Sequence, residues 1–149
     1  MCSDPIFPTI SPISPRAAIV LDTNIVLDVF VFNDSAAEPV RLALDNQKLD
    51  WLATPAMRVE LARVLTYPKI AARLVFYNLS ADDVLAKFDQ HARLVDAPPK
   101  AGVTCSDADD QMFIDLAVQH QCLLLSKDQD LISMKKRLLA QGIRVQAAM

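Results

Sequence analysis

Uninterrupted apolar runs alternate along this chain with segments in which apolar residues recur every three or four positions. The two clearest runs are AAIVL at residues 17–21 and CLLLS at residues 122–126. Neither shows polar alternation, which is typical of strands buried on both faces of a parallel sheet. Together with shorter runs they predict strands at residues 17–21, 49–54, 94–95, 122–126 and 143–145.

Helical spacing fills most of the intervals between these runs. Thr23 or Asn24 is suited to cap a first helix, and Ser35 with Glu38 three residues later matches the capping box of a second. Gly142 marks the end of the last helix. The pattern predicts helices at residues 23–32, 35–46, 55–67, 80–93, 109–121 and 129–141.

Strands that alternate with one or two helices predict an α/β fold, in which helices cover both faces of a mostly parallel sheet. A chain of 149 residues is the usual size of one domain. Four of the first fifteen residues are proline. We therefore expect residues 1–15 to form a flexible tail and residues 16–149 to form a single domain.

The amino-acid composition argues against several classes of protein. Cys2, Cys105 and Cys122 are odd in number and form no CxxC pair, which argues against a disulfide framework or a zinc site and fits a reducing cytoplasm. With only two glycines, the chain has no Gly-rich phosphate loop. No apolar run approaches the ~18 residues of a membrane span, and the N-terminus does not resemble a secretory signal.

Two aspartates follow the clearest strands directly. Asp22 comes after AAIVL, and Asp128 comes after LLLSK at the start of a predicted helix. Each can be a helix cap, and Asp130 can complement the dipole of the same helix. However, ligands of parallel sheets bind outside the carboxyl ends of the strands, which is where both residues are expected.

Two further carboxylates belong to helices. Asp110 lies near the middle of the apolar stripe of helix 109–121, whereas Asp107 and Asp109 point away from it. Glu60 lies too far inside helix 55–67 to be a cap. It is either a surface residue paired with Arg58 or Arg63, or a group that reaches the carboxyl end of the sheet.

Four carboxylates at one edge of a sheet would repel one another at neutral pH unless protons or cations offset their charge. Oxygen ligands without His or Cys suit Mg²⁺ or Mn²⁺ rather than zinc. Divalent ions held in this way are a standard means of cleaving phosphodiester bonds.

The chain resembles the PIN-domain ribonucleases, and most of all the VapC-like branch, whose members are toxin components of bacterial type II toxin–antitoxin systems. The resemblance covers residues 17 to 146. It is carried by the order and spacing of VLDTN (20–24), VELARVL (59–65), SDADDQMFIDLA (106–117) and LLLSKDQDL (123–131).

This resemblance implies a five-stranded parallel sheet in an α/β/α sandwich and a metal-dependent endoribonuclease. It implies that the catalytic metal ligands are Asp22, Glu60, Asp110 and Asp128. Asn24 would orient the site and Ser126 would hold a carboxylate or a water, with auxiliary ligands among Asp107, Asp109 and Asp130. Family members commonly form homodimers, and a small antitoxin blocks the toxins by entering the acidic cleft.

The charge balance departs from that of most nucleic-acid-binding proteins. The net charge is −3, and the clearest basic cluster is KKR at residues 135–137. These side chains, with Arg58, Arg63, Lys69 and Arg73, either contact a phosphate backbone or are solvated helix faces.

Three alternatives follow from the same residues. A haloacid-dehalogenase-like phosphotransferase needs a second aspartate where Asn24 stands, and a phosphorelay receiver needs an aspartate where Thr54 and Pro55 stand. A catalytically silent PIN-like module that acts through a protein partner stays open, because a sequence does not report turnover.

Overall fold

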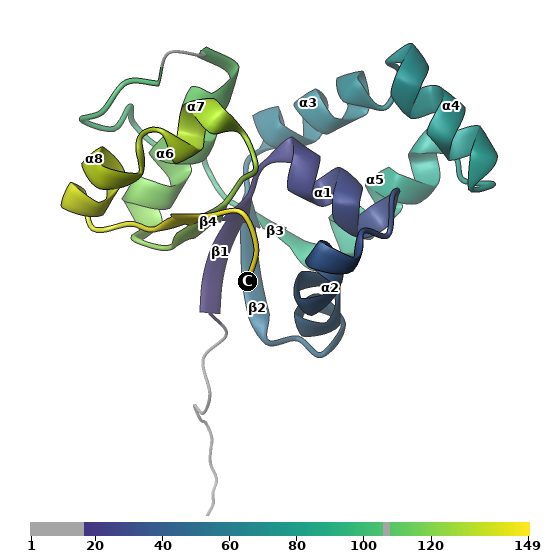
Figure 1. The fold of residues 1–149 in the computed structure, drawn as a ribbon, viewed down its shortest axis with the longest axis horizontal. Helices are drawn as coiled ribbons and strands as arrows, with labels where there is room; N and C mark the ends of the chain where they lie inside the picture. Colours follow the sequence, from purple (N-terminus) through teal and green to yellow (C-terminus); the bar gives the residue numbers. More distant parts are fainter. Residues whose placement is uncertain (1–16, 106–107) are drawn as a thin grey trace, which may run out of the picture.

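The computed structural model describes residues 17–105 and 108–149, so the expected tail at residues 1–15 lies outside the described residues. A five-stranded sheet with parallel pairing throughout runs through the centre of the fold (Figure 1). Its strand order is β3-β2-β1-β4-β5, as the predicted α/β fold requires. The strands are β1 (Ala17–Leu21), β2 (Leu49–Ala53), β3 (Ala92–Leu94), β4 (Leu123–Leu125) and β5 (Val145–Gln146).

The helices form two layers, one on each face of the sheet (Figure 1). One layer contains α1 (Thr23–Phe30), α2 (Glu38–Asp45), α3 (Pro55–Val64), α4 (Pro68–Phe76) and α5 (Ala81–His91). The other contains α6 (Ala108–His120), α7 (Gln129–Ile132) and α8 (Lys135–Ala140). Among the described residues, no helix is long and apolar enough to cross a membrane.

The connections reverse direction at the centre of the sheet. The chain leaves β1 through α1 and α2 to reach β2, whereas it arrives at β4 from β3 through α6 on the other face. β1 and β4 are paired side by side, with Leu21 opposite Leu125. Such a switch point leaves a crevice outside the carboxyl ends of the two strands.

Burial explains why these two strands lack polar alternation. Val20, Leu124 and Leu125 are fully buried between the helical layers, each contributing about 1.5–3 kcal/mol relative to exposure. Trp51 of β2 packs edge-on against Phe88 of α5 with ring centroids 5.0 Å apart. The residues that follow β1 and β4 are therefore carried by the closely packed centre of the sheet.

Several predicted boundaries are wrong. Asp22, rather than Thr23 or Asn24, is the N-cap of α1. Asp34, rather than Ser35, caps the short 3-10 helix Ser35–Ala37 that precedes α2. In both cases the sequence offers adjacent polar residues that are all good caps, so composition does not select among them.

Two helical segments also differ from the prediction. α4 was not predicted, because Pro68 reads as a stop signal, yet it occupies the first position of α4, where proline is tolerated. Residues 129–141 form two helices, α7 and α8, because the chain turns at Ser133 and buries Met134.

The two glycines of the chain provide a matched test of this fold. Gly142 has a φ of 87°, and an added Cβ would meet the side chain of Gln121, whose amide donates to the carbonyl oxygens of Val118 and Gln141. Gly142→Ala should therefore lower the free energy of unfolding by about 1–3 kcal/mol.

Gly102 is the control, because a Cβ there makes only ordinary contacts of 3.8 and 3.9 Å with Gln141. Gly102→Ala should change stability by less than about 0.5 kcal/mol in urea unfolding. Equal losses in both variants would contradict a specific requirement for glycine in the turn after α8.

Candidate functional site

The side chains that follow β1 and β4 are joined by one hydroxyl group. The Ser126 Oγ–H donates to Asp22 Oδ2, and the same Oγ accepts from the backbone N–H of Asp128 at 3.0 Å. The other oxygen of Asp22, Oδ1, accepts from the N–H of Ile25 at 2.9 Å and so caps α1. Ser126 thereby fixes Asp22 relative to the loop that carries Asp128.

Asp22 is a buried carboxylate, with only 3% of its surface exposed. Burial raises its pKa from the ordinary 3.8 to about 6, against the opposing effect of the hydrogen bonds from Ser126 and Ile25. The negative charges of Asp128 and Asp28 raise it further. A carboxylate held at such a cost is suited to a site where a cation compensates its charge.

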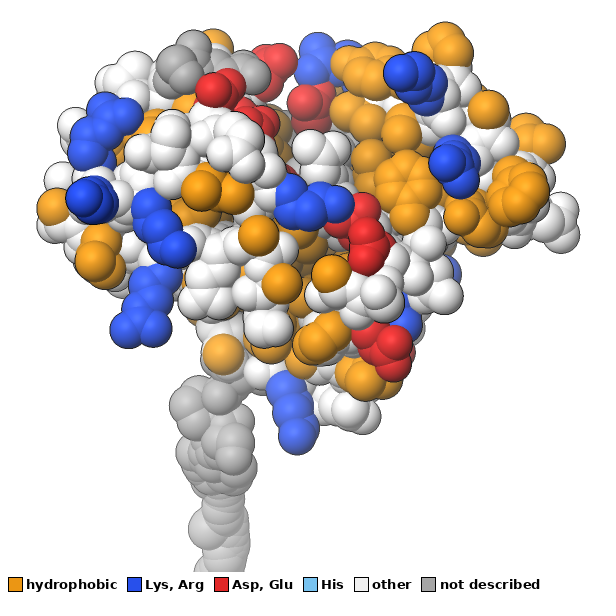
Figure 2. Space-filling model, viewed as in Figure 1, with side chains coloured by type: hydrophobic (Ala, Val, Ile, Leu, Met, Phe, Trp, Pro, Cys, Tyr) orange, Lys and Arg blue, Asp and Glu red, His pale blue; other side chains and the backbone are white. Residues whose placement is uncertain are grey.

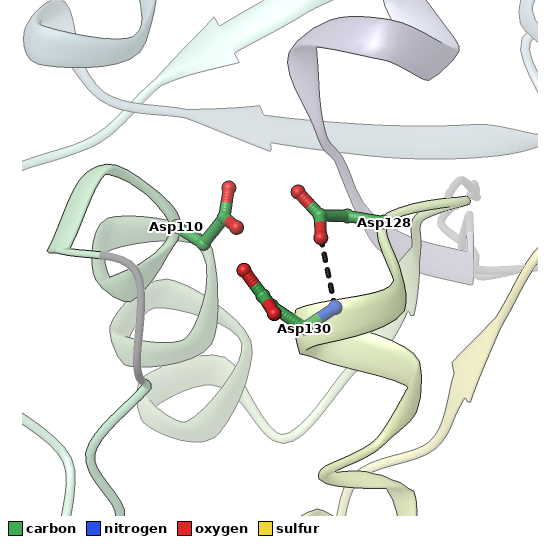
Figure 3. A group of neighbouring side chains, drawn as sticks. All are labelled: Asp110, Asp128 and Asp130. Atoms are coloured by element: carbon green, nitrogen blue, oxygen red, sulfur yellow. Dashed lines mark hydrogen bonds between the residues drawn. The ribbon is translucent and has the colours of Figure 1, made fainter.

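Three other carboxylates, those of Asp110, Asp128 and Asp130, converge on one another (Figure 3). Asp110 comes from the first turn of α6, while Asp128 caps α7 and Asp130 lies in the first turn of α7. Each offers an oxygen that lies within 4.8 Å of the oxygens offered by the other two. The N–H of Asp130 donates to Asp128 Oδ1 at 2.8 Å, which holds two of the three together.

The first turn of α6 separates two neighbouring aspartates. Asp110 is half-buried and faces the other two carboxylates, whereas Asp109 is exposed. Acidic side chains gather in this part of the molecule, between the side that carries α6 and α7 and the side that carries α3 (Figure 2).

This group of three aspartates fits a hard divalent cation. Its donors are all carboxylate oxygens, the set that Mg²⁺ and Mn²⁺ prefer. Three negative charges at this separation repel one another unless a cation or protons offset them. Asp130, which sequence reasoning ranked as auxiliary, is a full member of the group, whereas Asp22 and Glu60 lie outside it.

Glu60 is paired with Arg63 on α3, and only 16% of its side chain is exposed. Arg58 is instead paired with Asp89, with bonds of 2.7 and 2.8 Å. Glu60 and Arg63 line a pocket of about 260 Å³ between α3 and α6, together with Ala56, Val59, Ala108, Asp109 and Met112.

The other predicted site residues have simpler positions. Asn24 is exposed in the first turn of α1. Asp107 lies outside the described residues. These positions assign no role to Asn24 or to Asp107.

Sequence reasoning missed an ion pair between a buried aspartate and an exposed lysine beside the site. Asp28 of α1 is 6% exposed and pairs with Lys127, the residue between Ser126 and Asp128. The hydrogen bond with Asp28 raises the pKa of the Lys127 ammonium, so this cation is held on α1. A carboxylate inside the apolar run IVLDVFVF was the signal, since a buried charge needs a partner.

The raised pKa of Asp22 predicts a specific pH dependence of stability in the metal-free protein. The folded state keeps the proton of Asp22 up to a pKa of about 6, whereas the unfolded chain loses it near 3.8. The resulting stabilisation is complete below the unfolded pKa and disappears as pH rises through the folded pKa. Between about pH 3 and 7, wild type should lose roughly 3 kcal/mol relative to Asp22→Asn.

Urea unfolding in the presence of a chelator, at several pH values, measures this difference. Asn preserves the shape and the cap but carries no titrating proton, so it isolates this one group. A constant difference between wild type and Asp22→Asn across the range would contradict the burial cost of the carboxylate.

Comparison with known proteins agrees with the fold. A solved structure of VapBC2 from Rickettsia felis, bound to a DNA fragment from the promoter, contains a chain that shares the fold with a TM-score of 0.58. The likeness covers 86% of this chain and 98% of that chain at 14% identity. No curated protein sequence matches. The family model of the PIN domain matches residues 18–130, and the chain therefore belongs to the PIN-domain family.

Proposed function

We propose that this protein is a metal-dependent endoribonuclease that hydrolyses RNA phosphodiester bonds with Mg²⁺ or Mn²⁺. The observation that carries the proposal is the convergence of Asp110, Asp128 and Asp130 beside the buried Asp22. Membership of the PIN-domain family supports the same reaction class. In this reaction a water oxygen attacks phosphorus, the bond to the leaving sugar oxygen breaks, and that oxygen takes up a proton.

Asp110, Asp128 and Asp130 would hold the cation, and Asp22 would lie next to it through the Ser126 bridge. When bound, the cation would lower the pKa of a water ligand and neutralise charge on the phosphate oxygens. The protein itself holds these carboxylates in fixed positions. Ser126 orients Asp22 and the Asp128 loop, while the Lys127–Asp28 pair ties that loop to α1.

We further propose that the enzyme acts as the toxin of a toxin–antitoxin pair in the cytoplasm. The fold shared with a chain of VapBC2 supports this assignment. Cys122 is a buried free thiol, which agrees with a reducing compartment. A small antitoxin and a second copy of the chain are the partners expected from the resemblance.

A second candidate is a PIN-like module that acts only through a protein partner. One surface favours it: a groove of about 390 Å³ on α4, lined by Phe32, Lys69, Ile70, Arg73 and Tyr77. Val75 and Phe76 beside it are 79% and 75% exposed, and apolar side chains gather over α4 (Figure 2). Contiguous exposed apolar surface is typical of protein contacts. A nuclease with an antitoxin also needs such a surface, so turnover distinguishes the two candidates.

RNA cleavage is the direct test. Wild type with Mg²⁺ or Mn²⁺ should cleave a pool of structured RNAs, and EDTA should abolish cleavage. Asp110→Asn and Asp128→Asn should each lower the rate by at least about a hundredfold, because each removes one charge that holds the cation. Gel electrophoresis or sequencing of the RNA fragments measures cleavage by wild type and by each variant.

Asp82→Asn is the matched control, since Asp82 is an exposed aspartate in the first turn of α5. It should cleave as wild type does. Equal cleavage by wild type and Asp110→Asn would show that the site is misassigned, and no cleavage by wild type would favour the binding module.

Metal binding can be measured without turnover. With a chelator, Asp110→Asn should melt at the same temperature as wild type or higher, because like-charge repulsion is relieved. Mn²⁺ at about 100 times its Kd should stabilise wild type by about 2.7 kcal/mol and Asp110→Asn by clearly less. Thermal unfolding of wild type, Asp110→Asn and Asp82→Asn with and without Mn²⁺ provides the comparison. A metal-free loss in Asp110→Asn would instead indicate a structural role for the carboxylate.

A further inference from the structure

Residues 131–149 differ in charge from the rest of this acidic chain. They include four of the 15 Lys and Arg residues and none of the 18 Asp and Glu residues. The four are Lys135, Lys136, Arg137 and Arg144. The segment that contains α8 and β5 is therefore basic, although the chain as a whole has a net charge of −3.

The four basic side chains of this segment lack carboxylate partners. Elsewhere, an ion pair with Asp or Glu is formed by each of Arg41, Arg58, Arg63 and Arg93. Within residues 17–105 and 108–149, no ion pair involves a side chain of the basic segment, and all four are exposed. Cations so close in sequence repel one another. An anionic ligand would relieve this repulsion.

The buried side of α8 fixes the direction of its cations. Leu138 is fully buried, and its carbonyl oxygen accepts from the N–H of Ile143 at 3.1 Å. At about 100° per residue, Lys136 points away from Leu138, with Lys135 and Arg137 to either side. Figure 2 shows Lys and Arg side chains over the part of the molecule that carries α8, at the left of the view. We call Lys135, Lys136 and Arg137 the α8 basic surface.

Hydrogen bonds attach α8 to the helix that carries Asp130. The Ser133 Oγ–H donates to the carbonyl oxygen of Asp130 at 2.9 Å, and the N–H of Met134 donates to that of Leu131 at 3.1 Å. α7 and α8 lie next to each other on the same side of the sheet (Figure 1). The chain from Asp130 to Lys135 spans at most about 18 Å. The α8 basic surface is therefore held close to one of the three aspartates.

The phosphate backbone of RNA is the anion that suits this position. A strand in a duplex carries one charge per about 3.4 Å, so a strand with one phosphate at the aspartates would reach α8 within about five nucleotides. Lys and Arg make many of the contacts between proteins and nucleic-acid phosphates. Lys is depleted in protein–protein interfaces, so two lysines favour a nucleic acid over a protein here.

We infer that the α8 basic surface binds the phosphate backbone of the RNA substrate, a few nucleotides away from the cleaved bond. The inference rests on the proposed ribonuclease function and adds a second contact to the one at the metal. Such a contact is independent of base sequence, because it involves only phosphates. It positions the strand and takes no part in the chemical step.

RNA binding by the chelated full-length protein is the first test. Each phosphate contact with a single strand is worth about fivefold in affinity at 0.1 M salt, so Lys135→Gln/Lys136→Gln should raise the Kd for a 12-nucleotide RNA by about 25-fold. The slope of log K against log salt concentration should fall by about 1.4. Fluorescence anisotropy over a series of salt concentrations measures both quantities.

Two variants are matched controls. Lys48→Gln/Lys87→Gln removes two exposed lysines elsewhere and should leave the Kd within about twofold of wild type. Lys135→Arg/Lys136→Arg keeps both charges and should bind as wild type does.

Substrate length is the second test, with Mn²⁺ present. Lys135→Gln/Lys136→Gln should lower kcat/KM for the 12-nucleotide RNA by about 25-fold, mainly through KM. A trinucleotide is too short to reach α8 from the aspartates, so both proteins should cleave it at the same rate. An equal loss on the two substrates would indicate damage to the site and would contradict the inference.

The outcomes separate the two proposals. Weaker RNA binding by Lys135→Gln/Lys136→Gln, without cleavage by wild type, would overturn the nuclease and leave the α8 basic surface standing. Cleavage by wild type, with the same RNA affinity in both double Gln variants, would overturn the surface alone. Tighter binding of wild type to phosphatidylserine vesicles than to RNA would also overturn it, and would identify α8 as a membrane contact.

Discussion

The hydrogen bonds of one serine hydroxyl, Ser126 Oγ, connect the two parts of the chain on which the site depends. Ser126 follows β4, donates to Asp22 after β1, and accepts from the backbone of Asp128. Residues more than a hundred positions apart in the sequence are thus joined at the switch point of the sheet. Because Ser126 is fully buried and Asp22 nearly so, the hydroxyl has no room to rotate towards solvent, and the two aspartates keep one relative position.

The same burial that gives the site its precision makes its charges unfavourable. Asp22 is desolvated, and Asp110, Asp128 and Asp130 lie within mutual repulsion. Lys127 attracts Asp22 electrostatically, but its ion pair is with Asp28 of α1. Repulsion among the four carboxylates therefore remains for a bound cation to offset. This is expected of a binding site and not of a structural ion network.

The fold could be predicted where local pattern and burial agree. β1 and β4 are apolar throughout because helices cover both faces, and that pattern predicts a parallel sheet without knowledge of any contact. α4 could not be predicted, because Pro68 is compatible with both the end and the start of a helix. Neither could the cap of α1, since three adjacent residues can fill that position and only packing selects Asp22.

The site, like the fold, could be predicted from the sequence only in part. Sequence periodicity places Asp110 on the inner side of its helix, but no periodicity states that Asp130 joins it, because α7 is too short to show a stripe. For Glu60, the sequence left two alternatives, a surface pair with an arginine or a position at the edge of the sheet. The structure shows the first of these, the pair with Arg63, in the pocket between α3 and α6.

The acidity of the chain is then consistent with binding RNA. A net charge of −3 disfavours a polyanion only if the negative charge is spread over the contact surface. Here three aspartates are concentrated where a divalent cation would reverse the local field. Glu60 and Asp109 line the pocket between α3 and α6, where Arg63 pairs with Glu60 and offsets part of this charge. The negative charge is thus concentrated where a bound cation would offset it.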